Sequence, residues 1–191
     1  MKARNVLPSQ HYLRECFDYD PETGDLRWKV RPASHFRNSR EGMGGQANAN
    51  KRAGQLAGTI TSYGSGGGNL FYRQVKVGGR FYRAHRIIWA WMTGDDPGDQ
   101  VDHHNRDGLD NAWLNLRPAT SSQNGANRLA QRNNRLGIKG VRAYKGGGNI
   151  FIARIKFRGQ EVHLGTFPSA LQAQRAYDQA AVWYFREFAR S

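Results

Sequence analysis

Alternating hydrophobic and polar residues predict two β-hairpins in the first half of the chain. Within residues 12–31, FDY and LRWKV flank DPETG, whose proline and glycine are typical of turns. Farther along, LFYRQVKV and RFYRAH are separated only by Gly78 and Gly79. A two-residue glycine loop suits the left-handed turn that strand twist requires. Residues 32–68, between the two hairpins, are rich in glycine, asparagine and serine, so we expect them to be irregular or mobile.

Two later segments have patterns typical of helices. RAHRIIWAWMTG, residues 83–94, predicts a short helix that ends at Gly94. PATSSQNGANRLAQRNNR, residues 118–135, predicts another, with Thr120 as N-cap and Gln123 three residues later in a capping-box arrangement. In the first of these helices the positions expected in the core are Ile87, Ile88, Trp91 and Met92.

A further break near residues 130–137 precedes three hydrophobic runs, GVRAY, IFIARIKF and EVHLGTF, which predict three strands. FPSALQAQ then begins a final helix, with Ser169 as N-cap and Gln172 at the third position. Small and aromatic residues recur there at helical spacing, and such a stripe lets a helix lie close to a sheet. We interpret the stripe as packing: it comprises Ala173, Ala176, Tyr177, Ala180, Ala181 and Tyr184.

Composition narrows the class of protein. The formal net charge of +14 favours a polyanion as partner. Cys16 is the single cysteine, which excludes an internal disulfide and a cysteine-clustered zinc site. The sequence has no signal-peptide core and no apolar run long enough for a membrane span, so we expect a cytoplasmic protein without membrane contact.

The positive charge is concentrated in one block, because no acidic residue lies between Asp110 and Glu161. A solvated face normally mixes signs, so this block indicates contact with phosphates. Its cations are Arg117, Arg128, Arg132, Arg135, Lys139, Arg142, Lys145, Arg154, Lys156 and Arg158.

The stretch VDHHNRDGLDNAWLNLRPATSSQN, residues 101–124, combines a carboxylate, adjacent imidazoles and several carboxamides. Hydrolysis of a phosphodiester needs an activated water and stabilisation of extra negative charge, and one divalent ion can provide the second. A neutral imidazole can accept a proton near pH 7, while Mg²⁺ takes carboxylate and carboxamide oxygens as ligands. The mixture therefore suits DNA cleavage if a DNA phosphate completes the metal shell.

These residues, DHHN…DN…NLR…T…QN, resemble the HNH nucleases, in particular phage and intron-encoded homing endonucleases with asparagine as the third motif residue. The resemblance implies a ββα-metal (His-Me finger) module that holds a divalent ion, Mg²⁺ or Mn²⁺. It makes Asp102 and Asn124 metal ligands, His103 the general base and Asn115 the asparagine that ties the loop and positions His103. DNA contacts from this part are expected at Arg117, Asn127 and Arg128, with Asn127 as either a ligand-shell or a surface residue.

The C-terminal runs GIKGVRAY, FIARI, HLGTF and ALQAQRAYDQAA, within residues 136–182, resemble the ethylene-response-factor type of plant DNA-binding domain, the APETALA family. That family has a three-stranded antiparallel sheet packed on one helix, with the sheet in the major groove. This chain has His163 where the family has tryptophan, and Tyr144 and Glu161 where it has arginine, so a base preference cannot be transferred. The matching DNA-contact positions are Lys139, Arg142, Tyr144, Arg154, Lys156 and His163.

We therefore predict an α+β protein with three parts: an HNH nuclease domain with β-hairpins (1–130), a linker (131–136) and an ethylene-response-factor-like domain (137–191). The predicted function is metal-dependent cleavage of one or both strands of double-stranded DNA. A monomer is favoured, encoded by a phage or mobile element and working in the bacterial host cytoplasm. Two alternatives stay open: a DNA-binding regulator with a decayed nuclease site, and an RNA-binding or ribosome-associated protein.

Overall fold

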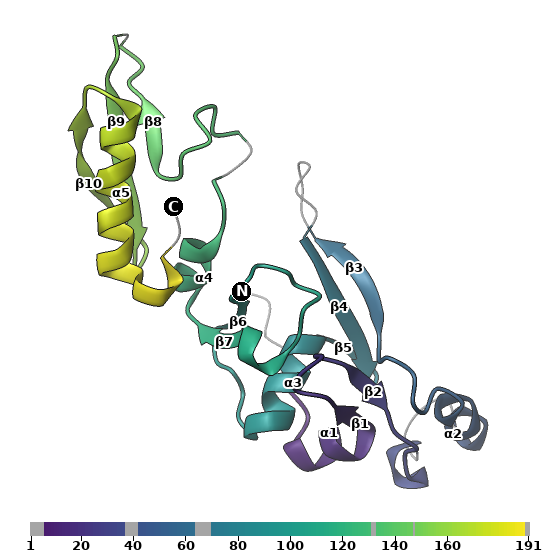
Figure 1. The fold of residues 1–191 in the computed structure, drawn as a ribbon. Coiled ribbons are helices and arrows are strands. Elements are labelled where there is room, and N and C mark those ends of the chain that lie inside the picture. Colours follow the sequence, from purple (N-terminus) through teal and green to yellow (C-terminus); the bar gives the residue numbers. More distant parts are fainter. Residues whose placement is uncertain (1–5, 37–41, 64–69, 131–132, 147, 190–191) are drawn as a thin grey trace. The chain divides into compact units, whose positions relative to one another are not determined.

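A computed structural model shows a mixed α+β protein with several small antiparallel sheets (Figure 1). The chain folds into two compact units, Met1–Pro118 and Ala119–Ser191, which we call unit 1 and unit 2. No helix among the residues that the structure describes is long and apolar enough to cross a membrane. The described residues are 6–36, 42–63, 70–130, 133–146 and 148–189.

Unit 1 begins with helix α1 (Gln10–Cys16), which the sequence pattern did not predict. Its N-cap is Ser9, whose side chain accepts a hydrogen bond from the backbone of Tyr12. Strands β1 (Phe17–Tyr19) and β2 (Leu26–Trp28) follow and pair antiparallel, so the first predicted hairpin is confirmed over a shorter range.

The prediction of irregular structure for residues 32–68 is wrong over much of that segment. It contains a 3-10 helix, η1 (Ala33–Phe36), helix α2 (Gly42–Asn50) and strand β3 (Thr59–Tyr63). Strand β3 is an edge strand whose hydrogen bonds come from β4, so its partner rather than its own sequence defines it. The remaining residues of the segment, 37–41 and 64–68, lie outside the described part of the chain.

The second predicted hairpin and the helix after it are confirmed. Strands β4 (Leu70–Val77) and β5 (Arg80–Arg83) pair antiparallel around the two glycines, and β3 completes the sheet in the order β3-β4-β5. Helix α3 (Ala84–Thr93) ends at Gly94, which has the left-handed φ of 84° that favours glycine at a helix end.

The core of unit 1 lies where α3 packs against α1 and against strands β4, β5 and β6. Its largest side chains are fully buried, and each contributes about 1.5–3 kcal/mol by leaving water. They include Leu13, Phe17, Leu26, Val75, Ile87 and Ile88.

The last part of unit 1 holds the motif region. Strand β6 (Gln100–His103) pairs with β7 (Leu116–Ala119), and the 3-10 helix η2 (Trp113–Asn115) precedes β7. The loop that connects β6 to η2 is compact, and it is described with the candidate site below.

The first helix of unit 2 is α4 (Ser121–Asn127). The predicted capping box is confirmed: the Thr120 side chain accepts from the Gln123 backbone, and the Gln123 side chain accepts from the Thr120 backbone. The helix is shorter than predicted and ends at Arg128, whose backbone is extended. Glycine and asparagine near its end are poor helix formers, which accounts for the early stop.

The rest of unit 2 is a three-stranded antiparallel sheet in the order β10-β9-β8, with one helix packed against it. Its strands are β8 (Val141–Ala143), β9 (Phe151–Phe157) and β10 (Gln160–Phe167). Helix α5 (Ala170–Phe185) starts at the predicted cap, Ser169, and the 3-10 helix η3 (Arg186–Phe188) follows it.

The core of unit 2 is built around small residues where the helix meets the sheet. Ala153 on β9 and Ala173 and Ala181 on α5 are almost completely buried, which lets the helix lie close to the strands. Ala126 of α4 belongs to the same core. The boundary between the compact units therefore precedes α4, whereas the predicted linker, 131–136, follows it.

Candidate active site

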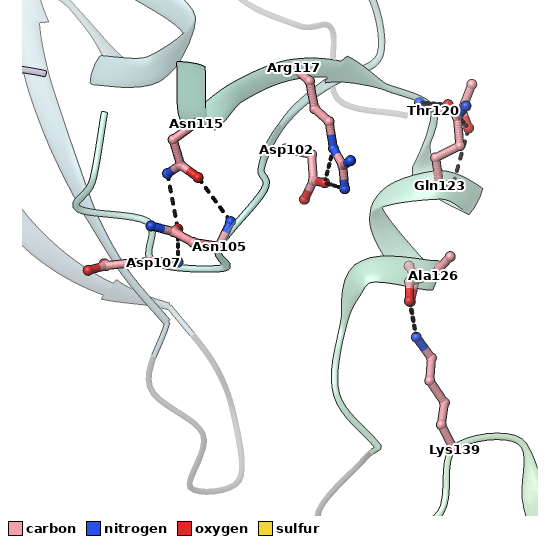
Figure 2. Close-up of polar contacts among 10 residues, drawn as sticks. Asp102, Asn105, Asp107, Asn115, Arg117, Thr120, Gln123, Ala126 and Lys139 are labelled. Carbon is pink, nitrogen blue, oxygen red and sulfur yellow. Dashed lines mark hydrogen bonds and ion pairs between the residues drawn. The ribbon is translucent and has the colours of Figure 1, made fainter. Parts of the chain in front are cut away.

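Asn115 closes the loop between β6 and η2. Its Oδ1 accepts from the backbone N–H of Asn105 (2.9 Å), and its Nδ2 donates to Asn105 Oδ1 (3.0 Å) and to the carbonyl of Asp110 (2.7 Å). The two facing asparagines are drawn in Figure 2. The backbone carbonyl of Asn115 also accepts from the N–H of His104 (2.8 Å). One carboxamide thus satisfies polar groups on both sides of a segment that lacks regular structure.

Other polar side chains of the loop bond to the loop itself. Asn105 Oδ1 accepts from the N–H of Asp107, and Asp107 Oδ1 accepts from the N–H of Leu109. The carboxylate of Asp110 accepts from Asn105 Nδ2 (2.6 Å) and from the N–H of Ala112 (3.1 Å). These carboxylates serve local turn geometry, as short polar side chains commonly do.

His103 is buried and is oriented by Asn111. His103 Nε2 lies 3.2 Å from Asn111 Oδ1, while Asn111 Nδ2 donates to the carbonyl of Leu109. With the amide oriented by that donation, Oδ1 faces the ring and accepts from Nε2 in the tautomer that carries its proton there. In that tautomer the Nδ1 atom of His103 bears the lone pair of the imidazole.

The surroundings of His103 favour its uncharged form. Its ring packs edge-to-face against His85, with centroids 4.9 Å apart, and lies near Tyr72. Burial lowers the pKa of His103 below its usual value, although the hydrogen bond to Asn111 opposes that shift. Burial lowers the pKa of His85 much further. At neutral pH His103 is therefore in the state that accepts a proton.

Asp102, at the end of β6, is buried and paired with Arg117 on β7. Its Oδ2 accepts from Arg117 Nε (3.0 Å) and Nη2 (2.9 Å), as the dashed lines of Figure 2 show. The pair compensates a carboxylate that would be costly to bury alone. Arg117 was predicted to bind DNA, and the structure places its guanidinium on the predicted metal ligand.

The first hairpin of unit 1 supports this loop from outside the motif. The hydroxyl of Tyr19 donates to the carbonyl of Asn111 (2.9 Å), and the N–H of Trp113 donates to the carbonyl of Pro21 (2.9 Å). Gly24 approaches so closely that a Cβ there would lie 2.4 Å from the backbone N of Ala112. Residues far apart in sequence therefore hold the backbone that bears the orienting asparagine.

The remaining motif asparagines belong to unit 2. Asn124 lies in α4, where its N–H donates to the carbonyl of Thr120 (3.0 Å). Asn127 is buried at the end of the same helix, and Arg128 beyond it is exposed. The structure thus gathers Asp102, His103, Asn115 and Arg117 in unit 1, and the other three predicted residues in unit 2.

Four predicted DNA-contact residues share one face of the sheet in unit 2. On β9 the buried residues Ala153 and Ile155 face the core with α5, so Arg154 and Lys156 lie on the opposite face. Pairing places His163 beside Arg154 and Arg142 beside Ile152 on that face. Arg154 also forms an ion pair with Glu161 on the neighbouring strand. Tyr144 is exposed just beyond β8.

Lys139 has a different environment from the other predicted DNA contacts. Its ammonium donates to the backbone carbonyls of Gly125 (3.0 Å), Ala126 and Arg128 (2.6 Å), at the C-terminal end of α4. Figure 2 shows the long side chain reaching the Ala126 carbonyl. The sequence predicted that Lys139 lies on a strand and faces DNA. Its bonds to the three carbonyls could be seen only in the folded structure.

The predicted metal ligands are not part of a preassembled acidic cluster. Within the ranges that the structure describes, no group of three or more His, Cys, Asp or Glu side chains is positioned to hold a metal ion. The motif instead offers single oxygen donors, a carboxylate at Asp102 and a carboxamide at Asn124. Such hard oxygen ligands suit Mg²⁺, which usually completes its shell with water and substrate phosphate.

Comparison with known proteins gives one match. A family model described as HNH endonuclease matches residues 82–126, which run from β5 to α4 and include Asp102, His103, Asn115 and Asn124. Searches of the curated proteins and of the solved structures found no match. The family match supports an HNH nuclease as the class of this segment.

Two residues near the candidate base were not predicted to act there. The motif gives neither Asn111 nor His85 a role beside the candidate base. The motif places Asn111 eight positions after His103, but only the folded loop brings its carboxamide to the imidazole. His85 reaches the site from α3 through packing alone, and no spacing rule relates it to His103.

Proposed function

We propose that this protein is a divalent-metal-dependent HNH endonuclease that hydrolyses phosphodiester bonds of double-stranded DNA, by nicking or by cutting both strands. The observation that carries the proposal is the family match over residues 82–126, which spans Asp102, His103, Asn115 and Asn124 in order. The buried, oriented imidazole and the loop closed by Asn115 support this proposal.

In this proposal His103 is the general base. Its Nδ1 accepts a proton from the attacking water, while Asn111 holds Nε2 and so fixes the direction of the ring. Asn115 is a positioning residue, because it closes the loop that follows His103. Asp102 and Asn124 would hold the metal ion, Mg²⁺ or Mn²⁺. When bound, the ion stabilises negative charge on the phosphate and on the leaving oxygen.

The basic sheet of unit 2 supports DNA as the substrate. Arg142, Arg154, Lys156 and His163 lie on the sheet face away from α5, where side chains can meet phosphates and base edges. We propose that this sheet is the DNA-binding surface of an ethylene-response-factor-like domain. The combination is typical of phage and mobile-element endonucleases, so we extend the proposal to such a source.

Plasmid cleavage tests the proposal directly. With Mg²⁺ present the protein should convert supercoiled plasmid to nicked or linear DNA, and EDTA should stop the reaction. His103→Ala should lower the rate by about 10²–10⁴-fold, the usual contribution of a general base. His104→Ala is the matched control, because the imidazole of His104 is exposed and should be dispensable for cleavage.

Binding measurements distinguish the alternatives. The His103→Ala protein should bind duplex DNA nearly as well as wild type, since phosphate contacts elsewhere supply most of the affinity. A wild-type protein that binds duplex DNA but leaves it intact would favour the regulator. Preference for RNA without cleavage would favour the RNA-binding alternative. Loss of activity in His104→Ala but not in His103→Ala would show that the wrong histidine was chosen.

A further inference from the structure

The segment matched by the HNH family model is divided between the two compact units. It covers residues 82–126, whereas the boundary between the units falls between Pro118 and Ala119. Helix α4, which carries Asn124, packs with α5 and η3 and therefore belongs to the unit that holds the basic sheet.

Helix α4 cannot be stable by itself. It has 7 residues, with the sequence SSQNGAN. Of these residue types, only alanine and glutamine are good helix formers. Isolated helices shorter than about 12–15 residues are marginal in water even with favourable sequences. The helix must therefore be held by other elements of the fold.

The C-terminal unit holds the helix along its length. Near its start, the Ser122 hydroxyl accepts from the N–H of Arg158 in the turn between β9 and β10 (3.3 Å). Near its end, Ala126 packs in the core that includes Phe185 and Phe188. The capping box satisfies the first N–H groups, but the carbonyls at the other end need donors of their own.

Lys139 supplies those donors. Its ammonium bonds to the carbonyls of Gly125, Ala126 and Arg128, and a cation at this end also interacts favourably with the helix dipole. An ammonium has three donors in all, so three carbonyl partners use the full set. The same group is then poorly placed to bind a DNA phosphate, in contrast to the exposed Lys156 on β9.

We propose that Lys139 is a positioning residue for cleavage and not a DNA contact: it fixes α4, and with it Asn124, to the DNA-binding unit. The recognition unit thus carries a part of the catalytic apparatus, and loss of α4 order lowers turnover even when DNA is fully bound. The role of Asn124 rests on the proposed function, whereas the anchoring of α4 rests on the hydrogen bonds of Lys139.

The test compares full-length Lys139→Met with Arg175→Met, which removes one positive charge from an exposed position of α5 outside the predicted DNA contacts. In Lys139→Met, hydrogen exchange of the α4 amides should rise about tenfold, as expected for loss of charged hydrogen bonds, while exchange in β9 stays unchanged. Cleavage at saturating DNA should fall about tenfold or more, with little change in Kd. In Arg175→Met, exchange of the α4 amides and cleavage at saturating DNA should both stay at the wild-type level.

Each result decides one part of the proposal. Unchanged exchange in α4 would overturn the anchoring, and raised exchange with wild-type turnover would overturn the role in cleavage. If the wild-type protein cut no DNA, both the proposed function and the role of Lys139 in cleavage would be wrong. Hydrogen exchange of the α4 amides would still test whether Lys139 anchors the helix. If Lys139→Met also loses protection in β9, Lys139→Arg replaces it. Arginine keeps a cation with donors, so this variant should retain both the protection of α4 and the turnover. Loss of either would count against the proposal.

Discussion

The predicted functional residues of the two units differ in how they are held. In unit 1, Asp102 and His103 are about 5% exposed and each is bonded to a neighbouring side chain. In unit 2, Arg142 and Lys156 lie exposed on a sheet. A group that must direct a proton or a metal ion benefits from a fixed orientation. A group that meets a flexible, charged backbone gains more from exposure and from its net charge. The comparison therefore predicts that substitutions affect stability in unit 1 and affinity in unit 2.

The largest effect is expected in the core of unit 1. Ile88 is fully buried, and Ile88→Ala should lower the free energy of unfolding by about 2–5 kcal/mol through lost burial and a residual cavity. Native-state hydrogen exchange can assign this loss to individual elements, and amides of α3 and β4 should lose protection while those of β9 keep theirs. Equal loss in β9 would mean that the two units unfold as one, and the comparison would fail.

A smaller effect is expected at the closed loop. Asn115→Ala removes the partners of Asn105 and Asp110, and leaving such groups unpaired costs about 1–3 kcal/mol. Exchange of the Asn105 amide should rise, and cleavage should fall because the loop after His103 loosens. Asn115→Asp is the matched control, since its carboxylate can still accept from the Asn105 N–H but cannot donate to Asp110. Full loop protection in Asn115→Ala would rule out this bracing role.

The smallest change in stability is expected on the sheet of unit 2. Arg142→Ala alters an exposed side chain, so the free energy of unfolding should change by no more than about 0.5 kcal/mol. Affinity for duplex DNA should fall, and the slope of log K against log salt should decrease by about 1 for each lost phosphate contact. Arg175→Ala, on an exposed position of α5, is the control and should leave the slope unchanged. Identical salt slopes for the two variants would place DNA elsewhere on the protein.

The sequence correctly predicted the turns, helix ends and caps that are set by a few neighbouring residues. The glycine pair between β4 and β5, Gly94 after α3 and the capping box at Thr120 all specify backbone geometry within a few residues, and the structure has each of them. Strand β3 lacked such a signal. Its Ile60 is largely exposed, and its hydrogen bonds come from β4, so its own hydrophobic pattern carried no information about its structure.

The same distinction applies to the candidate site. The motif residues Asp102, His103 and Asn115 could be chosen from type and spacing because they belong to one short stretch. Their partners could not be chosen in that way. The bonds from Arg117 to Asp102 and from Asn111 to His103 depend on how the loop closes. The roles of all these residues stay predictions until variants are measured.

The position of the unit boundary has a consequence for the design of chimaeras. A natural choice for a junction would be the sequence break at 131–136, between the HNH motif and the basic sheet. A foreign recognition module joined there would leave α4 behind without Lys139 and Phe188, the residues that hold it. A junction after Pro118 would transfer α4 together with its supports. If unit 2 recognises DNA as proposed, exchanging unit 2 between related proteins would also exchange Asn124, one residue of the motif.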